Sequence, residues 1–210
     1  AWPDDGGVGI PQHQGVDGQT QMRQDVLPVA LAGVNLENNA MGSTFGDVDG
    51  DGHLDWYTTA IFNVGTDECD GGQCISGNRM YRNEGYRCFE DIAWETGTFN
   101  GYWGWGAALI DFDNDGDLDL VETNGFKVPY GPPAGFFRNR PMKAWQNDGL
   151  DENDIPIMTD VSEETGLSDN RFQGRGLLPF DYDGDGDLDL LVTDNGSDLR
   201  MYRNDRQEDY

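Results

Sequence analysis

The stretch Asp111-Phe-Asp113-Asn-Asp115-Gly116-Asp117-Leu-Asp119 decides the fold of this 210-residue chain, because the chain contains the pattern three times. Its counterparts are Asp47-Val-Asp49-Gly-Asp51-Gly52-His53-Leu-Asp55, which begins 64 residues earlier, and Asp181-Tyr-Asp183-Gly-Asp185-Gly186-Asp187-Leu-Asp189, which begins 70 residues later. Self-similarity of this kind indicates tandem copies of one supersecondary unit.

The similarity extends on both sides of the acidic loops. Phe89-Glu-Asp91-Ile-Ala-Trp-Glu-Thr-Gly97 matches Met158-Thr-Asp160-Val-Ser-Glu-Glu-Thr-Gly166. Each unit closes on a related tetrapeptide: Met80-Tyr-Arg-Asn83, Ala144-Trp-Gln-Asn147 and Met201-Tyr-Arg-Asn204. We therefore expect an N-terminal arm or linker, three units and a short tail. The boundaries are 1–21 for the arm, 22–83, 84–147 and 148–205 for the units, and 206–210 for the tail.

Each unit predicts strands rather than helices. Short apolar runs bounded by Gly, Asn and Asp enter and leave the acidic loops, and this pattern is typical of β-strands. The second unit contains four such runs, at about 88–93, 105–110, 118–123 and 143–146. Four strands per repeat favour an all-β fold of about three four-stranded antiparallel blades, the arrangement of a β-propeller.

Two units carry insertions between their third and fourth predicted strands, at Asn63–Asn78 and Gly125–Pro141. The first insertion holds Cys69 and Cys74, which we expect to form a disulfide if the compartment is oxidising. Cys88 stands apart from this pair, next to Phe89 in an apolar stretch. We expect it to be a buried free thiol.

Composition excludes several classes of function. Forty Asp and Glu against 13 Lys and Arg give a net charge of −27, which disfavours nucleic acid and anionic membranes as partners. No apolar run approaches the roughly 20 residues that insert across a bilayer. A hydrophobic content of 36% is too high for a disordered acidic tail. Because the chain begins at Ala1, we expect either a processed secreted protein or part of a longer one.

The acidic loops have the donor set of a cation site. Carboxylates at loop positions 1, 3, 5 and 9 supply hard oxygen ligands, glycine at position 6 permits a sharp turn, and position 7 offers its backbone carbonyl. Flexible all-oxygen coordination favours Ca²⁺ over Mg²⁺, so we expect about three Ca²⁺ ions. The predicted ligands are the carboxylates of Asp47, Asp49, Asp51, Asp55, Asp111, Asp113, Asp115, Asp119, Asp181, Asp183, Asp185 and Asp189, and the carbonyls of His53, Asp117 and Asp187.

An EF-hand is the main alternative for these loops, since it also places a Glu at position 12. Only the second loop has a Glu there, Glu122, whereas Thr58 and Val192 occupy the position in the other two. The flanking segments are strand-like rather than helical. We therefore reject the EF-hand and expect Glu122 to be an ordinary exposed strand residue.

The acidic loops, preceded by Gly-x-Ala as in Gly106-Ala-Ala108 and followed by Tyr-Arg-Asn, resemble FG-GAP/VCBS-type repeats over about residues 22–205. The chain is similar in particular to the group that contains cartilage acidic protein and UnbV-like secreted proteins. The resemblance implies the blades of a calcium-binding β-propeller, as in the integrin α-chain head. It also implies an extracellular or cell-surface location and metal ligation by the loop aspartates.

Three blades are fewer than the 4–8 of closed propellers. We therefore expect self-association, or a protein partner that covers the open blade edges. One hypothesis is that the N-terminal arm pairs with a neighbour by strand addition. The second insertion brings together a further candidate group, which either docks an acidic partner surface or balances local aspartates. Its members are Lys127, Phe136, Phe137, Arg138, Arg140 and Lys143.

The sequence thus predicts a non-catalytic, calcium-rigidified extracellular module for adhesion or assembly. Neither His13 nor His53 lies in a catalytic arrangement with Ser or Cys. Two alternatives stay open: part of a secreted polysaccharide-active enzyme similar to the propeller lyases, and a glycan-binding module. In a glycan-binding module Tyr102, Trp103 and Trp105 would stack on sugar rings, whereas we favour their packing between blades.

Overall fold

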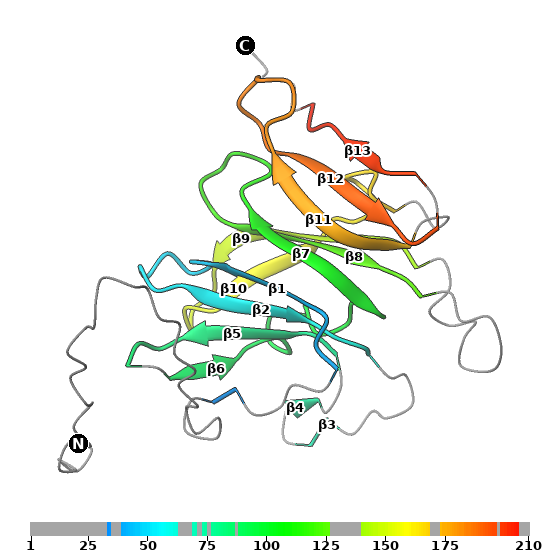
Figure 1. The fold of residues 1–210 in the computed structure, drawn as a ribbon. Coiled ribbons are helices and arrows are strands. Elements are labelled where there is room, and N and C mark those ends of the chain that lie inside the picture. Colours follow the sequence, from blue (N-terminus) through cyan, green and yellow to red (C-terminus); the bar gives the residue numbers. More distant parts are fainter. Residues whose placement is uncertain are drawn as a thin grey trace, which may run out of the picture.

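The computed structural model describes residues 33–34, 39–62, 69–70, 73–74, 77–86, 88–126, 140–168, 173–196 and 198–205. Within these ranges the chain forms strands and turns but no helix, which confirms the predicted all-β class. Three antiparallel sheets lie in a row that does not close on itself (Figure 1). The predicted N-terminal arm and C-terminal tail lie outside the described residues.

Sheet one contains β1 (Gly42–Gly46), β2 (Asp55–Thr59), β5 (Arg79–Asn83) and β6 (Phe89–Asp91), in that order. A separate hairpin of β3 (Cys69–Asp70) and β4 (Gln73–Cys74) belongs to the insertion between β2 and β5. Its backbone register places Cys69 opposite Cys74. The side chains of this pair lie outside the described part of the structure, so the disulfide stays a prediction.

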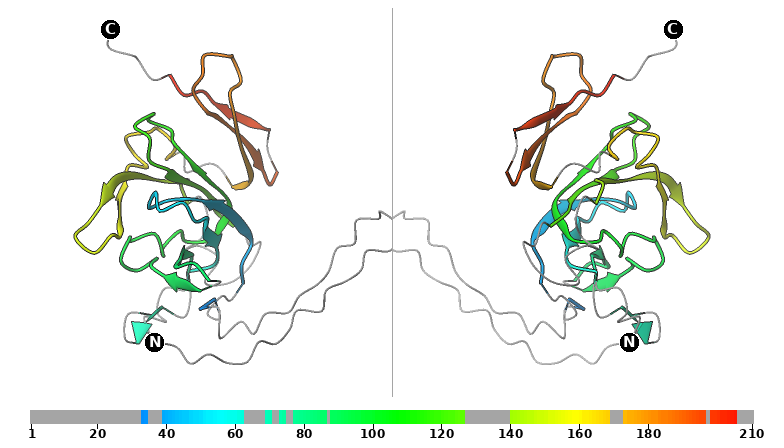
Figure 2. Two further views of the ribbon diagram at one scale, coloured as in Figure 1. Left: turned by 90° about the vertical axis from the view of Figure 1, so that its left-hand side faces the viewer. Right: turned by 90° about the vertical axis from the view of Figure 1, so that its right-hand side faces the viewer.

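Sheet two contains β7 (Gly104–Ile110), β8 (Asp119–Asn124), β9 (Lys143–Leu150) and β10 (Pro156–Asp160). Sheet three has β11 (Gly174–Phe180), β12 (Asp189–Asp194) and β13 (Arg200–Tyr202). Sheet two lies between the other two, with β7 packed against both β1 and β11. Two views turned by 90° show the same order (Figure 2).

The strands fall where the repeats predict them, but the sheets do not follow the predicted units. The first strand of the second unit, β6, pairs with β5 of the first unit, and β10 pairs in the same way with β9. The reason is local, because a short turn after Asn83 reverses the chain direction. The next strand, β6, therefore pairs with β5 as its antiparallel neighbour. Each sheet boundary is therefore displaced by one strand from the sequence repeat.

The core consists of two apolar clusters, one at each junction between sheets. Alternation of side chains along each strand gives sheet two an apolar face on both sides, and both faces are covered. The cluster between sheets one and two contains Val48, Tyr57, Met80, Ile92, Ala93, Leu109, Leu120 and Trp145. The cluster between sheets two and three contains Ala108, Ile110, Val121, Met142, Ala144, Leu167, Leu190 and Val192.

Two sequence predictions about single residues are wrong. Cys88 is an exposed free thiol rather than a buried one, because it lies in the turn that leads into β6, where its amide bonds to Gly85 O. Glu122 is completely buried rather than exposed. It shares with Leu120 the face of β8 that sheet one covers, and the sequence pattern gave no sign of that cover.

The Glu122 carboxyl links sheet two to sheet one. Its Oε2 accepts hydrogen bonds from Tyr57 Oη and Asn78 Nδ2, both at 2.7 Å. Gly101 makes the room, since a Cβ there would lie 1.9 Å from Oε1. Burial raises the pKa of Glu122 to about 8, although the hydrogen bonds from Tyr57 and Asn78 oppose the rise. The carboxyl is therefore mainly neutral at pH 7.

This burial predicts a pH dependence of folding. The folded chain keeps the Glu122 proton up to about pH 8, whereas the unfolded chain releases it near 4.5. The free energy of unfolding should therefore fall as pH rises between those values. Glu122→Gln, which carries no titrating proton, should become more stable relative to the original chain by about 2–4 kcal/mol between pH 4.5 and pH 8.5.

The measurement is urea denaturation of both chains at the two pH values with a chelator present. The loop carboxylates titrate in both chains, so the difference isolates Glu122. Exposed Glu163 provides the control, and Glu163→Gln should show no such change. A stability difference between Glu122→Gln and the original chain that does not vary with pH would contradict the neutral buried carboxyl.

Candidate metal centre

The three acidic loops occupy the same place in each sheet, between its first and second strands: β1 and β2, β7 and β8, β11 and β12. Two loop positions require the left-handed backbone region. Position 6 is Gly52, Gly116 or Gly186, with φ between 90° and 104°, as the sequence predicts. Position 4 also has positive φ, with 57° at Asn114. Glycine and asparagine tolerate this region best. This explains why position 4 is glycine or asparagine in all three loops, a restriction that sequence analysis missed.

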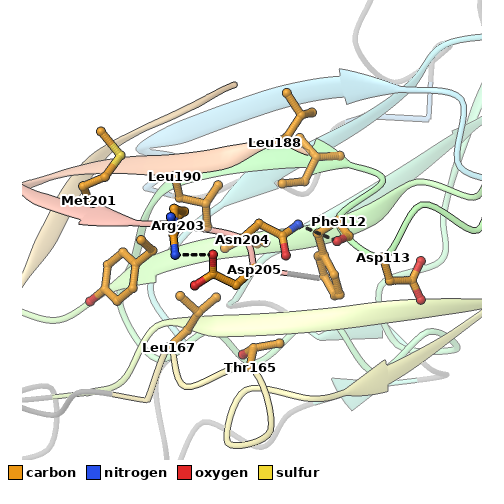
Figure 3. A pocket seen from close by; sticks show the side chains of 13 residues that line it. Phe112, Asp113, Thr165, Leu167, Leu188, Leu190, Met201, Arg203, Asn204 and Asp205 are labelled. Atoms are coloured by element: carbon orange, nitrogen blue, oxygen red, sulfur yellow. Dashed lines mark hydrogen bonds and ion pairs between the residues drawn. The ribbon is translucent and has the colours of Figure 1, made fainter. Parts of the chain in front are cut away.

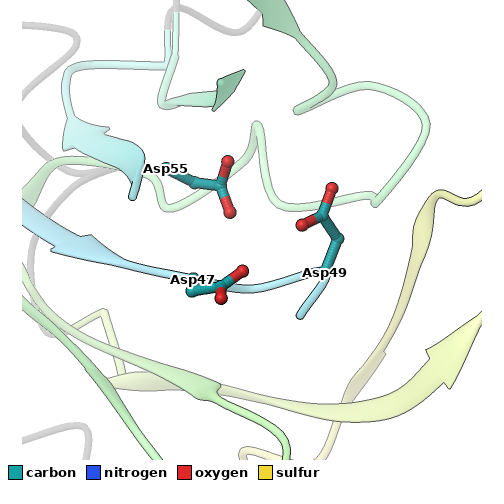
Figure 4. Close-up of side chains that lie close together, drawn as sticks. All are labelled: Asp47, Asp49 and Asp55. Atoms are coloured by element: carbon teal, nitrogen blue, oxygen red, sulfur yellow. The ribbon is translucent and has the colours of Figure 1, made fainter. Parts of the chain in front are cut away.

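The loop turns bring carboxylates from different positions together. In the first loop, oxygen atoms of Asp47, Asp49 and Asp55 lie within 4.8 Å of one another (Figure 4). Each of the other loops also holds three aspartates with oxygen atoms at this spacing, although the second loop contributes position 5 in place of position 9. They are Asp111, Asp113 and Asp115 in the second loop and Asp181, Asp183 and Asp189 in the third.

The carboxylate at position 1 is oriented by the loop backbone. Asp47 Oδ1 accepts a hydrogen bond from the amide of Asp51 at 3.1 Å, and Oδ2 accepts one from Gly52 at 2.9 Å. Asp111 accepts the same two bonds from Asp115 and Gly116. In the third loop Asp181 accepts the amides of Gly184 and Gly186, so each loop is folded around its first carboxylate.

The carboxylate at position 9 is buried and connects three segments of its sheet. Asp55 Oδ2 accepts the amide of Val48 in the loop, and Oδ1 accepts the amide of Asn83 at the end of β5, both at 2.8 Å. Asp119 and Asp189 form the same pair of bonds, at 2.7 to 2.9 Å. Because both oxygens are engaged, this residue fixes the loop to the sheet as well as lining the metal centre.

Positions 5 and 7 differ among the loops. In the first loop, Asp51 Oδ2 lies 2.9 Å from His53 Nδ1, and this contact lowers the pKa of Asp51 and raises that of His53. In the third loop, Asp187 accepts a hydrogen bond from Asn114 Nδ2 at 2.7 Å. Asp185 accepts the amide of Asp187, as Asp115 accepts that of Asp117. The predicted ligands therefore lie around one turn in each loop, although Asp51, Asp119 and Asp185 lie outside the tightest groups.

Crowding of like charge makes the centres electrostatically unfavourable without a cation. Burial raises the pKa of both Asp55 and Asp119 to about 6, and neighbouring loop carboxylates add to the rise. Burial also raises the pKa of Asp49, with the charges of Asp51 and Asp47 acting in the same direction. A bound cation would remove this repulsion, and the donor set consists of oxygen atoms only. These residues fit a hard divalent cation.

The aromatic residues that were candidates for sugar stacking pack inside the protein. Trp103 stacks on Phe126 with ring centroids 4.2 Å apart. Trp105 donates a hydrogen bond to Gly125 O, and the Arg175 guanidinium lies 4.0 Å from its ring centroid. Tyr102 is covered by Arg140 at 4.4 Å. Their expected packing between repeats is confirmed for Trp105, which contacts a residue of the third unit.

Only part of the candidate docking patch is described. Lys143 forms an ion pair with Asp160, and Arg140 contacts the Tyr102 ring. Both cations thus have partners within the chain, which agrees with the alternative that they balance local groups. Lys127, Phe136, Phe137 and Arg138 lie outside the described residues.

A cavity of about 600 Å³ lies between sheets two and three (Figure 3). Part of its polar lining is paired, since Arg203 binds Asp205 at 2.6 Å and Asn204 donates to Phe112 O. The buried hydroxyl of Tyr202, which also lines the cavity, has no hydrogen-bond partner among the described residues. The cavity lies beneath β13, which has no outer neighbour among the described strands. In sheet two, β10 fills that outer place and Met158 packs on the core. The cavity therefore lies where sheet two has a fourth strand and sheet three has none among the described residues.

No protein-family model matches this chain, and no curated protein matches it in sequence. None of the described residues forms a helix long and apolar enough to cross a membrane.

The raised pKa values of Asp55 and Asp119 predict that cation binding releases protons near pH 6. Because a metal binds the deprotonated carboxylates, calcium affinity at these two loops should fall about tenfold between pH 7.5 and pH 5. Calorimetric titration in two buffers of different ionisation enthalpy measures the released protons. At pH 8 the release should vanish, which is the internal control. Binding at pH 6 without proton release would contradict the assigned carboxylate states.

Proposed function

We propose that this chain is a calcium-binding structural module of the β-propeller type, in which each sheet is a blade held by one Ca²⁺ ion. The observation that carries the proposal is the threefold repetition of one loop geometry. All three loops gather carboxylate oxygens within 4.8 Å, and all three use a buried position-9 aspartate in the same pair of backbone hydrogen bonds.

Calcium suits these loops better than the other common cations. Each loop offers four carboxylates and one backbone carbonyl, and Ca²⁺ takes six to eight oxygen ligands in flexible geometry. Mg²⁺ requires a smaller octahedral shell and keeps several waters. Zinc prefers nitrogen or sulfur donors, and in the described loops the sole imidazole, that of His53, is hydrogen-bonded to Asp51.

The ion would act on the fold rather than on a substrate. The position-9 carboxylate joins the loop to the third strand of its sheet or to the segment that directly follows that strand, as Asp119 joins Phe112 to Asn147. Holding this carboxylate in its charged form stabilises that junction, so the free energy of calcium binding becomes free energy of folding. A module with this property is most stable where calcium is abundant, and extracellular modules use weak sites for that purpose.

The proposed role is therefore extracellular adhesion or assembly. Three bound ions would change the net charge from −27 to −21, which leaves a strongly acidic surface and keeps nucleic acid and anionic membranes unfavourable as partners. Trp103, Trp105 and His53 all have partners within the chain, so neither the lyase-like nor the glycan-binding alternative gains support from these three residues.

Removal of calcium should lower the melting temperature. At a hundredfold excess over Kd each site contributes about 2.7 kcal/mol, and about 1 kcal/mol moves the melting temperature of such a chain by about 2–4 °C. Three sites therefore predict a loss of at least about 16 °C on chelation. Differential scanning calorimetry in calcium and in excess chelator measures this difference. An unchanged melting curve would refute the structural role of the ion.

A loop variant tests the assignment of the ligands. Asp113→Asn should reduce the calorimetric stoichiometry from three ions to two, because a carboxylate of the second loop is lost while its fold is retained. Glu152→Gln removes the same charge from an exposed site outside the loops and is the matched control. Equal calcium binding by both variants would argue against the loop as the metal centre.

A further inference from the structure

The two internal junctions are built from the same parts. Antiparallel register aligns side chains in rows across each sheet, and one row faces the sheet that follows in the chain. We call it the forward row; it is Thr44–Tyr57–Met80 in sheet one, Ala108–Val121–Ala144 in sheet two and Leu178–Leu191–Met201 in sheet three. The row on the opposite face is the rear row. It is Phe45–Trp56–Tyr81, then Leu109–Leu120–Trp145, then Pro179–Leu190–Tyr202.

At each junction a forward row packs on the next rear row. This leaves the forward row of sheet three and the rear row of sheet one without a facing sheet among the described residues. The difference in exposure is large: Leu178 is 56% exposed, whereas its counterpart Ala108 is 4% exposed. On the other open face, Phe45 is 57% exposed and its counterpart Leu109 is 9% exposed. Tyr81, the third member of the rear row of sheet one, is completely buried within the chain, so this face is open around Phe45 and not along its whole row. The open parts of the two faces, around Leu178 and around Phe45, are both apolar.

The hydrogen bonds across the junctions repeat in the same way. Thr59 Oγ1 accepts the amide of Gly42 and donates to Trp105 O of sheet two at 2.6 Å. Thr123 accepts the amide of Gly106 and donates to Arg175 O of sheet three at 3.1 Å. Both threonines are buried.

Thr193 is the third member of this series and is exposed. Its Oγ1 accepts the amide of Gly176, as expected, but donates to no carbonyl among the described residues. The hydroxyl is therefore in place for a carbonyl of a further sheet.

The glycine whose amide bonds to each of these threonines shows how closely the next sheet approaches. A Cβ on Gly42 would lie 1.8 Å from Trp105 O, and a Cβ on Gly106 would lie 2.5 Å from Arg175 O. Gly176 meets nothing from another sheet and has no positive φ. Gly42 and Gly106 must be glycine because the backbone of the next sheet lies against them, whereas no backbone among the described residues lies against Gly176.

A second series of bonds runs in the reverse direction. Asn147 Nδ2 donates to Val48 O of sheet one at 3.0 Å, and Asn204 Nδ2 donates to Phe112 O of sheet two at 2.7 Å. Asn83 is the equivalent residue of sheet one, and among the described residues its side-chain amide donates to Leu54 O in its own sheet and to no other sheet. The carbonyl equivalent to those of Val48 and Phe112 belongs to Tyr182, which is exposed on sheet three.

We infer that the forward face of sheet three, around Leu178, Tyr182 and Thr193, binds the rear face of sheet one, around Phe45 and Asn83, in a second copy of this chain. The chain itself supplies both halves of the contact. The geometry is that of its two internal junctions. The inference rests on the assembling role in the proposed function, and it names the partner and the surfaces.

Such a contact is head to tail, so it continues until the ring closes. Two copies give six sheets, which is within the 4–8 blades of closed propellers, whereas three copies give nine. The expected species is therefore a two-membered ring with two identical junctions.

The test is the native mass in calcium, measured by light scattering at up to about 100 μM chain, where an interface of ordinary size associates. The original chain should have twice the mass of 23.3 kDa. Leu178→Asp and Phe45→Asp should each halve that mass. Ile157→Asp introduces the same charge at an exposed site on the edge strand β10 and should leave the mass unchanged.

Mixing the two monomeric variants separates a head-to-tail contact from a symmetric one. Phe45→Asp retains an intact sheet three and Leu178→Asp retains an intact sheet one, so together they should form a one-to-one pair through one junction. A monomeric original chain, or variants that remain dimeric, would overturn the inference. Calcium titration of the same samples keeps the two proposals distinguishable, because a monomer that binds three ions refutes only the interface.

Discussion

The buried carboxylate at the ninth loop position is the interaction on which the rest of the structure depends. In each sheet it accepts one amide from the acidic loop and a second amide from outside the loop. In sheets one and two the second amide belongs to the third strand, and in sheet three it belongs to Asn204, shortly after β13. A single side chain therefore joins the acidic loop to the third strand of its sheet or to the segment that directly follows it. Its burial makes the charged form costly, and a cation is the direct compensation for that cost.

The junctions between sheets depend on this arrangement. Asn83, Asn147 and Asn204 bond to the position-9 carboxylate through their amides, and the last two also donate from their side chains to a loop carbonyl of the preceding sheet. The metal centres and the packing of neighbouring sheets thus share residues. In this view calcium affects not only one loop but the whole row of sheets, including the open faces at its two ends.

Much of the fold could be predicted from sequence because its parts are local. The acidic loops and the strands beside them follow from spacing, glycine positions and apolar runs within a few residues of each other. The grouping of strands could not be predicted in this way, because the repeat does not say whether β6 pairs with the strand before it or after it. The predictions for Glu122 and Cys88 failed for a related reason. Segments distant in sequence bury Glu122, and no such segment buries Cys88.

The sequence by itself determined the all-β class, the three equivalent loops and the oxygen donors in them, since each depends on residues that are close along the chain. Only the tertiary structure decided which face of each strand is covered. It made Glu122 a neutral carboxyl between two sheets, gave Thr59 and Thr123 partners in the next sheet and left the equivalent Thr193 exposed. These outcomes depend on contacts between segments about 40 to 70 residues apart, and burial, unlike local turn geometry, is a property of the packed molecule.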